Sequence, residues 1–432
     1  MKKTIIDRFV ETCKANTDKT AFIGNGRKIS FGALLGDMYR MVQLIKDSGL
    51  KPGDQALIFV LPSYEFFLLM FAGIYCGINL VVTDNYKDIN AVRNILKSNR
   101  IPRVFCNSLT GCLRPAFPGI TFINVATYRA FPDTVQPCDC RADATVLTTF
   151  TSGTTGQPTP IYRNVQDFQE QIRIISENIC LNPQDVVFSK LPIYSLFLIF
   201  NGYTCVVSHK IRRKQLEKHG VCAILAPIAN LLAIEEELPF VQKVFIGGAM
   251  LYPGQVSQIL SRFPNADVTY IYGASECVLM AKANLREFHR TLALQTDISS
   301  VSLSIVNKDE NGVGQVCTRG RVVLTDTKEH ISNDLGYMDE SGLHLVGRKA
   351  FSTVGRYNYM TDIALLAENP GVRKGFSMAY ENKIYFCYEG RICHKKDDVV
   401  YVRFRKLPMD AKHRTKLNYH KALTVIKRKY GV

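Results

Sequence analysis

The sequence predicts an α/β protein with a large N-terminal domain of mixed sheets and packed helices and a small α+β C-terminal domain. Short apolar β-like runs alternate with segments that carry apolar residues at helical spacing. The 432 residues are enough for two or three domains, and 47% apolar with 21% charged residues is a globular composition. These proportions exclude a mostly disordered, collagen-like or coiled-coil chain.

The first elements show this alternation clearly. Apolar residues recur at helical spacing at Leu34, Leu35, Met38, Met41, Val42 and Ile45. Gly49 follows as a helix stop, and residues 56–61 read as a strand. The apolar run 66–82 is shorter than the span of about 20 residues that crosses a membrane. Because Gly73 and Gly77 interrupt it, we expect a buried helix, then a buried strand.

Later segments continue the pattern. Strands are expected at residues 80–83, 104–106, 145–150, 222–226 and 244–246, with a helix-like stretch up to Ser98 and a helix at 253–263 that begins with Pro253. Beyond Gly347 the chain becomes basic, with strands at 383–388 and 399–404 and a basic helical pattern at 416–428. We therefore place a domain boundary between Gly347 and Arg348, giving domains 1–347 and 348–432.

Charge and cysteine content narrow the expected partner and the expected cellular compartment. The net charge is +16, and residues 391–432 alone carry thirteen Lys and Arg against three Asp, which favours an anionic partner. The thirteen cysteines include no Cys-x-x-Cys pair and no zinc spacing, so they predict free thiols in a reducing compartment. The charged N-terminus does not read as a signal peptide. We expect a cytoplasmic protein without a membrane span.

The sharpest local signal follows the strand at 145–150. The next residues are Thr151, Ser152, Gly153, Thr154, Thr155 and Gly156. Glycines let backbone N–H groups point at an anion, and the four hydroxyls add donors for phosphate oxygens. No Gly-Lys-Ser/Thr follows, so this is not a Walker loop. The pattern predicts a phosphate-binding loop, and the alternative is an ordinary Ser/Thr/Gly surface turn.

This loop resembles the phosphate loop of the adenylate-forming superfamily of acyl-CoA synthetases, peptide-synthetase adenylation domains and luciferases. Those enzymes activate a carboxylate with ATP, release pyrophosphate and pass the acyl group to a thiol. Further motifs follow in the family's order along essentially the whole chain. Asp410-x-x-His413-x-x-Lys416 is most similar to the form found in stand-alone acyl- and aryl-AMP ligases.

The resemblance implies a set of nucleotide-binding residues. Gly248 and Ala249 correspond to a Gly-Gly-Ala turn beside adenine, and Tyr272 with Gly273 corresponds to the aromatic motif that stacks on it. By the same resemblance Asp334 accepts the ribose hydroxyls and Arg348 approaches the ribose. On residue type alone, Tyr272 could be a core aromatic and Asp334 a turn cap.

The resemblance also implies the catalytic residues and cofactors. Ser275 replaces the family's usual Thr, and Glu276 after it helps to hold Mg²⁺, a hard cation that prefers oxygen ligands. Lys416 corresponds to the catalytic Lys, which with backbone N–H groups stabilises charge on the phosphoryl oxygens. ATP and Mg²⁺ are the expected cofactors. Without the motifs, Glu276 and Lys416 could be ordinary surface charges.

Four departures from the family pattern bear on function. Thr159 and Pro160 stand where a Lys and a Gly usually follow the phosphate loop, and Arg163 is a candidate replacement for that cation. Ser195 stands where a His usually shapes the carboxylate pocket. Ala350 replaces the hinge acid about which the C-terminal domain of many members swings.

The substrate is less closely specified. Residues 192–200 contain no acid that could bind an amino group, which argues against an amino-acid substrate. Tyr194, Phe197 and Phe200 could line a hydrophobic acyl or aryl pocket or belong to the core. We expect activation of a fatty or aromatic acid, then transfer to an acyl carrier protein or coenzyme A.

Two alternatives stay open. The missing loop Lys and hinge acid are also compatible with a degenerate member that binds ATP or acyl-AMP without complete turnover. The basic tail, with Tyr401, Phe404 and Tyr419 among its cations, could instead bind nucleic acid. No standard nucleic-acid motif occurs in the sequence, so we do not expect that partner.

Overall fold

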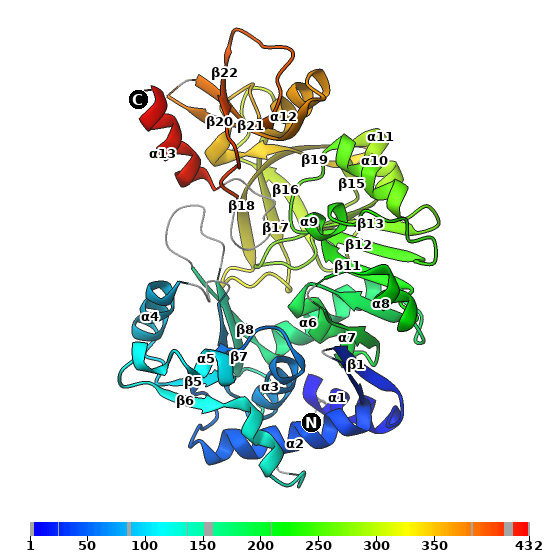
Figure 1. The fold of residues 1–432 in the computed structure, drawn as a ribbon, viewed down its shortest axis with the longest axis vertical. Helices are drawn as coiled ribbons and strands as arrows, with labels where there is room; N and C mark the ends of the chain where they lie inside the picture. Colours follow the sequence, from blue (N-terminus) through cyan, green and yellow to red (C-terminus); the bar gives the residue numbers. More distant parts are fainter. Residues whose placement is uncertain are drawn as a thin grey trace. The chain divides into compact units, whose positions relative to one another are not determined.

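In the computed structural model, the chain folds as two compact units, Met1–Ala226 and Pro227–Val432 (Figure 1). The structure describes residues 4–24, 26–83, 88–135, 137–150, 159–208, 210–381, 383–409 and 418–430. Helices and strands alternate in both units, so the predicted α/β class is confirmed. The boundary expected between Gly347 and Arg348 lies inside the second unit and stays a prediction.

The first unit contains two sheets and their helices. Its strands are β1 (Thr20–Gly24), β2 (Arg27–Ser30), β3 (Gln55–Phe59), β4 (Asn79–Val82), β5 (Arg103–Cys106), β6 (Thr121–Asn124), β7 (Thr145–Phe150), β8 (Pro160–Asn164), β9 (Val186–Ser189), β10 (Thr204–Val206) and β11 (Ala223–Pro227). Its helices are α1 (Ile5–Ala15), α2 (Phe31–Asp47), α3 (Tyr64–Tyr75), α4 (Ile89–Ser98), α5 (Ser108–Gly111), η1 (Arg114–Ala116), η2 (Val125–Ala130), α6 (Val165–Asn178), α7 (Pro192–Phe200) and α8 (Arg213–Lys218).

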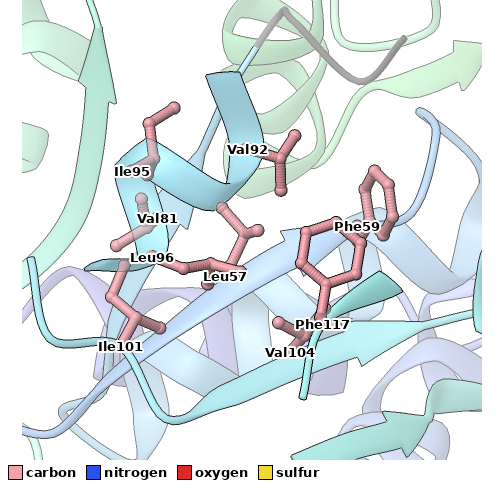
Figure 2. Close-up of a cluster of buried hydrophobic side chains, with 9 residues drawn as sticks. All are labelled: Leu57, Phe59, Val81, Val92, Ile95, Leu96, Ile101, Val104 and Phe117. Carbon is pink, nitrogen blue, oxygen red and sulfur yellow. The ribbon is translucent and has the colours of Figure 1, made fainter. Parts of the chain in front are cut away.

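One sheet has the strand order β6-β5-β3-β4-β7-β8. All of its pairs are parallel except β7–β8, which is antiparallel. Apolar side chains of α4 and of the sheet form a core cluster, in which Val92, Ile95 and Leu96 of the helix pack with Leu57 of β3 and Val81 of β4 (Figure 2). Burying such apolar area is the main stabilising term for this layer.

The other strands of the first unit lie in the order β11-β9-β10-β1-β2, parallel except for the β1–β2 hairpin. Serine side chains cap the N-termini of two helices of this unit. Ser30 accepts from Ala33 N–H at the start of α2, and Ser63 accepts from Phe66 N–H at the start of α3. Every residue of α3 except Glu65 is buried. The predicted buried helix and the strand β4 that follows it are therefore confirmed.

The second unit begins with α/β elements and continues with antiparallel sheets. Its strands are β12 (Lys243–Gly247), β13 (Asp267–Tyr272), β14 (Ala281–Asn284), β15 (Ala293–Leu294), β16 (Ser302–Val306), β17 (Gly314–Arg319), β18 (Glu329–Asp339), β19 (Gly342–Arg348), β20 (Val372–Tyr380), β21 (Lys383–Gly390) and β22 (Val399–Arg403). Its helices are α9 (Ile228–Leu232), α10 (Pro253–Arg262), α11 (Leu285–Thr291), η3 (Lys349–Phe351), α12 (Asn358–Glu368) and α13 (Tyr419–Tyr430).

Three sets of strands organise this unit. β12 pairs with β13 in parallel, and β13 pairs with β14 antiparallel. An antiparallel sheet has the order β15-β19-β18-β17-β16, and a three-stranded sheet has the order β20-β21-β22. In the three-stranded sheet β21 pairs antiparallel with β20 and parallel with β22. Ala422 and Ile426 of α13 pack with Tyr385 and Val402 of this last sheet.

Within the described parts of the chain, no helix is both long enough and apolar enough to cross a membrane.

Candidate functional site

Two parallel strands of the second unit end side by side and bring two of the predicted motifs together. β12 leads into Gly248 and Ala249, and β13 ends at Tyr272. Val244 and Ile246 of β12 lie opposite Val268 and Tyr270 of β13. In open α/β sheets, ligands bind in the crevice outside such carboxyl ends.

The turn after Tyr272 requires a glycine. A Cβ added to Gly273 would lie 2.2 Å from the carbonyl oxygen of Val278, a distance that no side chain tolerates. The turn is closed by hydrogen bonds from Ala274 N–H to Cys277 O and from Met280 N–H to Tyr272 O, both 2.8 Å. Gly273 therefore lets the backbone of this turn pass close to the Val278 carbonyl group.

Tyr270 anchors the neighbouring turn. Its buried hydroxyl donates to the carbonyl oxygen of Ala249 at 2.9 Å. Gly248, with φ of +95°, adopts a conformation that favours glycine. The Gly-Gly-Ala turn is thus held by a strand-to-turn hydrogen bond that the sequence analysis did not identify.

Asp334 lies at the centre of the site. It is the cross-strand partner of Arg348 in the β18–β19 hairpin. Arg348 Nε donates to Asp334 Oδ1 at 2.8 Å, and Tyr272 Oη donates to Asp334 Oδ2 at 3.0 Å. Both charged side chains are less than one-fifth exposed, at 18% for Arg348 and 19% for Asp334. Three residues predicted from separate motifs therefore meet in one contact.

The electrostatics keep these donors protonated. Burial, and then the negative charge of Asp334, raises the pKa of the Tyr272 phenol well above its ordinary value. Burial acts to lower the pKa of Arg348, but the charge of Asp334, the neighbouring Tyr359 and the hydrogen bond to Asp334 outweigh it. The pKa of Arg348 is raised as a result, so the guanidinium stays charged.

A small cavity lies among these residues. Its lining is formed by residues from five segments of the second unit: Gly248, Ala249, Met250, Tyr270, Ile271, Tyr272, Gly273, Asp334, Leu345, Arg348 and Tyr359. Its volume of about 40 Å³ is far below the roughly 300–1,000 Å³ of sites that hold small molecules. A nucleoside can enter only if side chains of this lining move apart.

Apart from this small volume, the residues of the site fit the expected nucleotide. A carboxylate already bound by two donors, two glycine turns and an aromatic ring are the groups that would bind a ribose and a base. Glu276 follows the Gly273 turn, and its Oε1 lies 4.0 Å from Nδ1 of His330 on β18. The half-buried Glu276 carboxylate supplies oxygen ligands of the kind that Mg²⁺ prefers. Ser275 beside it is also half-buried.

Two groups of predicted site residues lie outside the described residues. These are the phosphate loop at Thr151, Ser152, Gly153, Thr154, Thr155 and Gly156, and the catalytic candidate Lys416. Their roles stay predictions.

Arg163, the candidate replacement for the missing loop cation, lies on β8 and is buried. Its Nη1 donates to Thr149 Oγ1 at 2.6 Å, near the end of the strand that leads into residue 151. Its Nε donates to Gln171 Oε1 at 3.3 Å. The guanidinium therefore lies beside the last described residues before the loop, and its replacement of the usual Lys stays a prediction.

Three aromatic residues were expected either at an acyl pocket or in the core, and two of them belong to the core. Phe197 is fully buried and makes an edge contact with Phe168 of α6. Phe200 contacts Phe9 of α1 and Phe71 of α3. Ser195, which stands where the family has a His, donates to Ser189 Oγ at 2.8 Å and is buried.

A second polar contact crosses the predicted domain boundary. Tyr252, the residue before α10, donates from its hydroxyl to Asp362 Oδ2 of α12 at 2.9 Å. Asp362 also accepts from the backbone N–H of Ser377 on β20. Asn358, the first residue of α12, accepts from Arg348 N–H at 2.7 Å. None of these contacts was predicted from the sequence, because they join residues that no local pattern links.

Comparison with known proteins identifies the family of the chain. The model of a family described as AMP-binding enzyme matches residues 9–325. The protein VraA of Staphylococcus aureus is 25% identical over 225 residues, which cover 46% of this chain and 49% of VraA. An olefin beta-lactone synthetase of Xanthomonas campestris is 26% identical over 277 residues, which cover 56% of this chain and 50% of that protein. The chain spans about half the length of the curated relatives it matches.

Solved structures share the fold over nearly the whole chain. The o-succinylbenzoate CoA synthetase MenE of Bacillus subtilis, in complex with the acyl-adenylate OSB-AMP, superposes with a TM-score of 0.83 at 16% identity, covering 96% of this chain and 97% of MenE. ATP-bound MatB of Rhodopseudomonas palustris gives a TM-score of 0.85 at 15% identity, covering 99% of this chain and 100% of MatB. These likenesses confirm the fold that the sequence motifs implied.

Asp362 gives a testable dependence of stability on pH. Burial raises its pKa from 3.8 to about 7, against the opposing hydrogen bonds from Ser377 and Tyr252. From about pH 4 to about pH 7, Asp362 ionises in the unfolded chain but keeps its proton in the folded chain, so its contribution to stability falls as pH rises. We expect Asp362→Asn, which does not titrate, to gain free energy of unfolding relative to the unsubstituted protein across this window. Urea denaturation at several pH values measures the difference.

Asp309→Asn is the control. A hydrogen bond from the Tyr357 hydroxyl contributes most to lowering the pKa of Asp309. This carboxylate is therefore ionised in both states above about pH 5, and its variant should show a constant difference there. A difference for Asp362→Asn that stayed constant with pH would contradict the assignment.

Proposed function

Because the chain belongs to the family of AMP-binding enzymes, we propose that it is an AMP-forming acid–thiol ligase. It activates a carboxylic acid with ATP to an acyl-adenylate, releases pyrophosphate, and passes the acyl group to a thiol. The observation that carries the proposal is the Asp334 carboxylate held by Tyr272 and Arg348 beside the Gly248 and Gly273 turns. These are the residues that the family motifs place around the nucleoside.

Asp334 and its partners bind the nucleoside in this proposal. The ribose hydroxyls take over acceptor positions on Asp334, while Arg348 keeps the carboxylate charged and oriented. Tyr272, at the end of β13, offers its ring to the adenine, with Gly248 and Ala249 along its edge. When the cavity opens, ribose hydroxyls of the ligand replace protein hydrogen-bond donors at Asp334. The Asp334 carboxylate is therefore never left without a hydrogen-bonding partner.

The chemical step is a displacement at phosphorus. A substrate carboxylate oxygen attacks the α-phosphorus of ATP, and the bond from that phosphorus to the bridging oxygen of pyrophosphate breaks. Negative charge builds on the phosphoryl oxygens, and Lys416 with the residues 151–156 stabilises it. Glu276 would hold Mg²⁺, which supplies charge neutralisation at the phosphates. A thiol then displaces AMP from the acyl carbon.

The substrate is proposed to be a fatty or aromatic carboxylic acid. VraA carries the name of a candidate long-chain fatty acid–CoA ligase, and MenE is named for an aryl acid. The segment 192–200 contributes no carboxylate that could pair with an amino group, and most of α7 is buried and apolar. These features favour an apolar acid over an amino acid.

A second candidate is a family member that binds nucleotide without turnover. Thr159 and Pro160 in place of the usual Lys and Gly, and the small volume of the cavity beside Asp334, favour it. The two candidates differ in one measurable property, acid-dependent exchange of pyrophosphate into ATP.

We expect Mg²⁺-dependent exchange of labelled pyrophosphate into ATP with at least one acid from a panel of fatty and aromatic acids. Lys416→Ala should lower this exchange by roughly 10²- to 10³-fold, because a contact that stabilises transition-state charge is lost. Glu276→Gln should lower the Mg²⁺-dependent rate. Lys421→Ala, an exposed lysine on α13, is the matched control and should keep its rate.

Exchange at background with every acid, from folded protein that binds ATP, would contradict the ligase proposal and favour the non-catalytic candidate. Near-normal exchange in Lys416→Ala would move the catalytic role to Lys412 or Arg163.

The acceptor is proposed to be an acyl carrier protein, with coenzyme A as the second choice. Both are anionic, and α13 presents Lys421, Lys427 and Arg428 as exposed cations. The ring of Tyr380 lies 5.0 Å from Lys427 Nζ. A basic surface of this kind raises the association rate of an acidic partner, and salt screens the attraction.

Replacing Lys421, Lys427 and Arg428 by Gln should slow acyl transfer several-fold at low salt and leave adenylation unchanged, and high salt should remove the difference. Transfer rates to holo carrier protein and to coenzyme A measure the effect.

The control replaces three exposed cations elsewhere, Lys51, Lys97 and Arg141, by Gln. Equal transfer by both triple variants would show that α13 does not steer the acceptor. Adenylation without transfer to either thiol would assign the loss of the second half-reaction to the altered hinge at Ala350.

A further inference from the structure

The first unit contains a second and much larger cavity, of about 510 Å³. Four of its lining side chains are cations: Arg27 and Lys28 from β2, Arg40 from α2, and Arg129 from η2. Tyr64 from the start of α3 and Tyr128 from η2 complete its polar wall. None of these residues belongs to the motifs that define the nucleotide site.

Two of the arginines share one carboxylate. Glu65 Oε1 accepts from Arg27 Nη1 at 3.0 Å and from Arg129 Nη2 at 2.8 Å. The guanidinium of Arg129 also lies over the ring of Tyr128, 4.9 Å from its centre. A guanidinium carries five N–H donors, and the bond to Glu65 engages one on Arg27 and one on Arg129. Glu65 therefore orients both groups and leaves donors for another anion.

Asp37 binds three further side chains of the cavity wall. Its Oδ2 accepts from Tyr64 Oη at 2.8 Å and from Tyr128 Oη at 3.2 Å, and its Oδ1 accepts from Arg40 Nη1 at 2.9 Å. Burial, and then the charge of Asp37, raises the pKa of Tyr128 to about 12, so this phenol stays a donor. Asp37, which also lines the cavity, is therefore bound by three donors.

Arg40 is held from two sides as well. Its Nη2 donates to Asp133 Oδ2 at 3.1 Å, in addition to its bond to Asp37. Four cationic side chains and three carboxylates (Glu65, Asp37 and Asp133) therefore lie at or beside the cavity. This cluster carries a net positive charge. Arginines oriented in advance lose less side-chain freedom when they bind a ligand, which favours affinity.

We propose that this cavity binds a small phosphorylated molecule. Planar guanidinium groups match phosphate oxygens with paired hydrogen bonds, and Lys28 adds a point charge beside them. The volume lies within the range of small-molecule sites. Ile29 is the only aliphatic residue in the described lining, so an alkyl chain would find little apolar surface there.

The inference does not depend on the proposed ligase activity, because it uses no residue of the nucleotide site. Inorganic pyrophosphate is a suitable probe, since it presents two phosphoryl groups without a base or sugar. Citrate, a carboxylate of similar charge, separates recognition of phosphate from general attraction of anions.

Arginine-selective dicarbonyl labelling, read residue by residue by mass spectrometry, locates the binding. Pyrophosphate should protect Arg27, Arg40 and Arg129, and citrate should protect them less. Arg141, which is 79% exposed and paired with Asp143, should react equally with and without pyrophosphate. Equal protection by citrate, or equal protection of Arg141, would overturn the proposal.

Lys28→Gln tests the charge without breaking the ion pairs that hold the arginines. It should raise the pyrophosphate concentration that half-protects Arg27 and Arg129 by roughly tenfold, whereas the exposed control Lys51→Gln should leave it unchanged. An unchanged concentration in Lys28→Gln, or no protection of the cavity arginines by pyrophosphate in the unsubstituted protein, would also overturn the proposal.

Discussion

The carboxylate of Asp334 is held from two sides, by the hydroxyl of Tyr272 and by the guanidinium of Arg348. This contact joins the end of β13 to the β18–β19 hairpin, so it holds the Tyr272 ring beside Asp334 and Arg348. A half-buried carboxylate without such donors would lose the hydrogen bonds that water provides. The proposed nucleoside site therefore depends on this one polar contact.

Hydrogen bonds extend from this contact to residues that follow Gly347. Arg348 N–H donates to Asn358, and Asn358 O accepts from Ser377 Oγ at 3.0 Å. Tyr252 and Asp362 form a further buried hydrogen bond between residues on either side of the predicted boundary. If the C-terminal segment swings about Ala350, the bond between Tyr252 and Asp362 is one that has to break.

The sequence motifs predicted residues that meet at this site, but they did not predict the residues that hold them in place. Tyr272, Asp334 and Arg348 were found through motifs, because a family pattern preserves residue type and order even where identity is low. Tyr270, Tyr359 and Asp362 were missed, because their roles come from contacts between segments far apart in the sequence. Local patterns predicted the buried helix α3 and the strands around it. They did not predict the β17–β19 sheet, where exposed and buried positions alternate irregularly around a bulge at Leu335 and Gly336.

Titration of ATP into the protein and into Asp334→Asn measures whether this carboxylate binds the nucleotide. Asn keeps the shape of the side chain but removes the charge that accepts the ribose hydroxyls. Asp339→Asn, on the same strand and 48% exposed, is the matched control. We predict that Asp334→Asn weakens ATP binding by about tenfold or more while Asp339→Asn binds normally, since charge-assisted hydrogen bonds are roughly twice as strong as neutral ones. Equal affinity of Asp334→Asn and the unsubstituted protein for ATP would show that Asp334 does not bind the ribose.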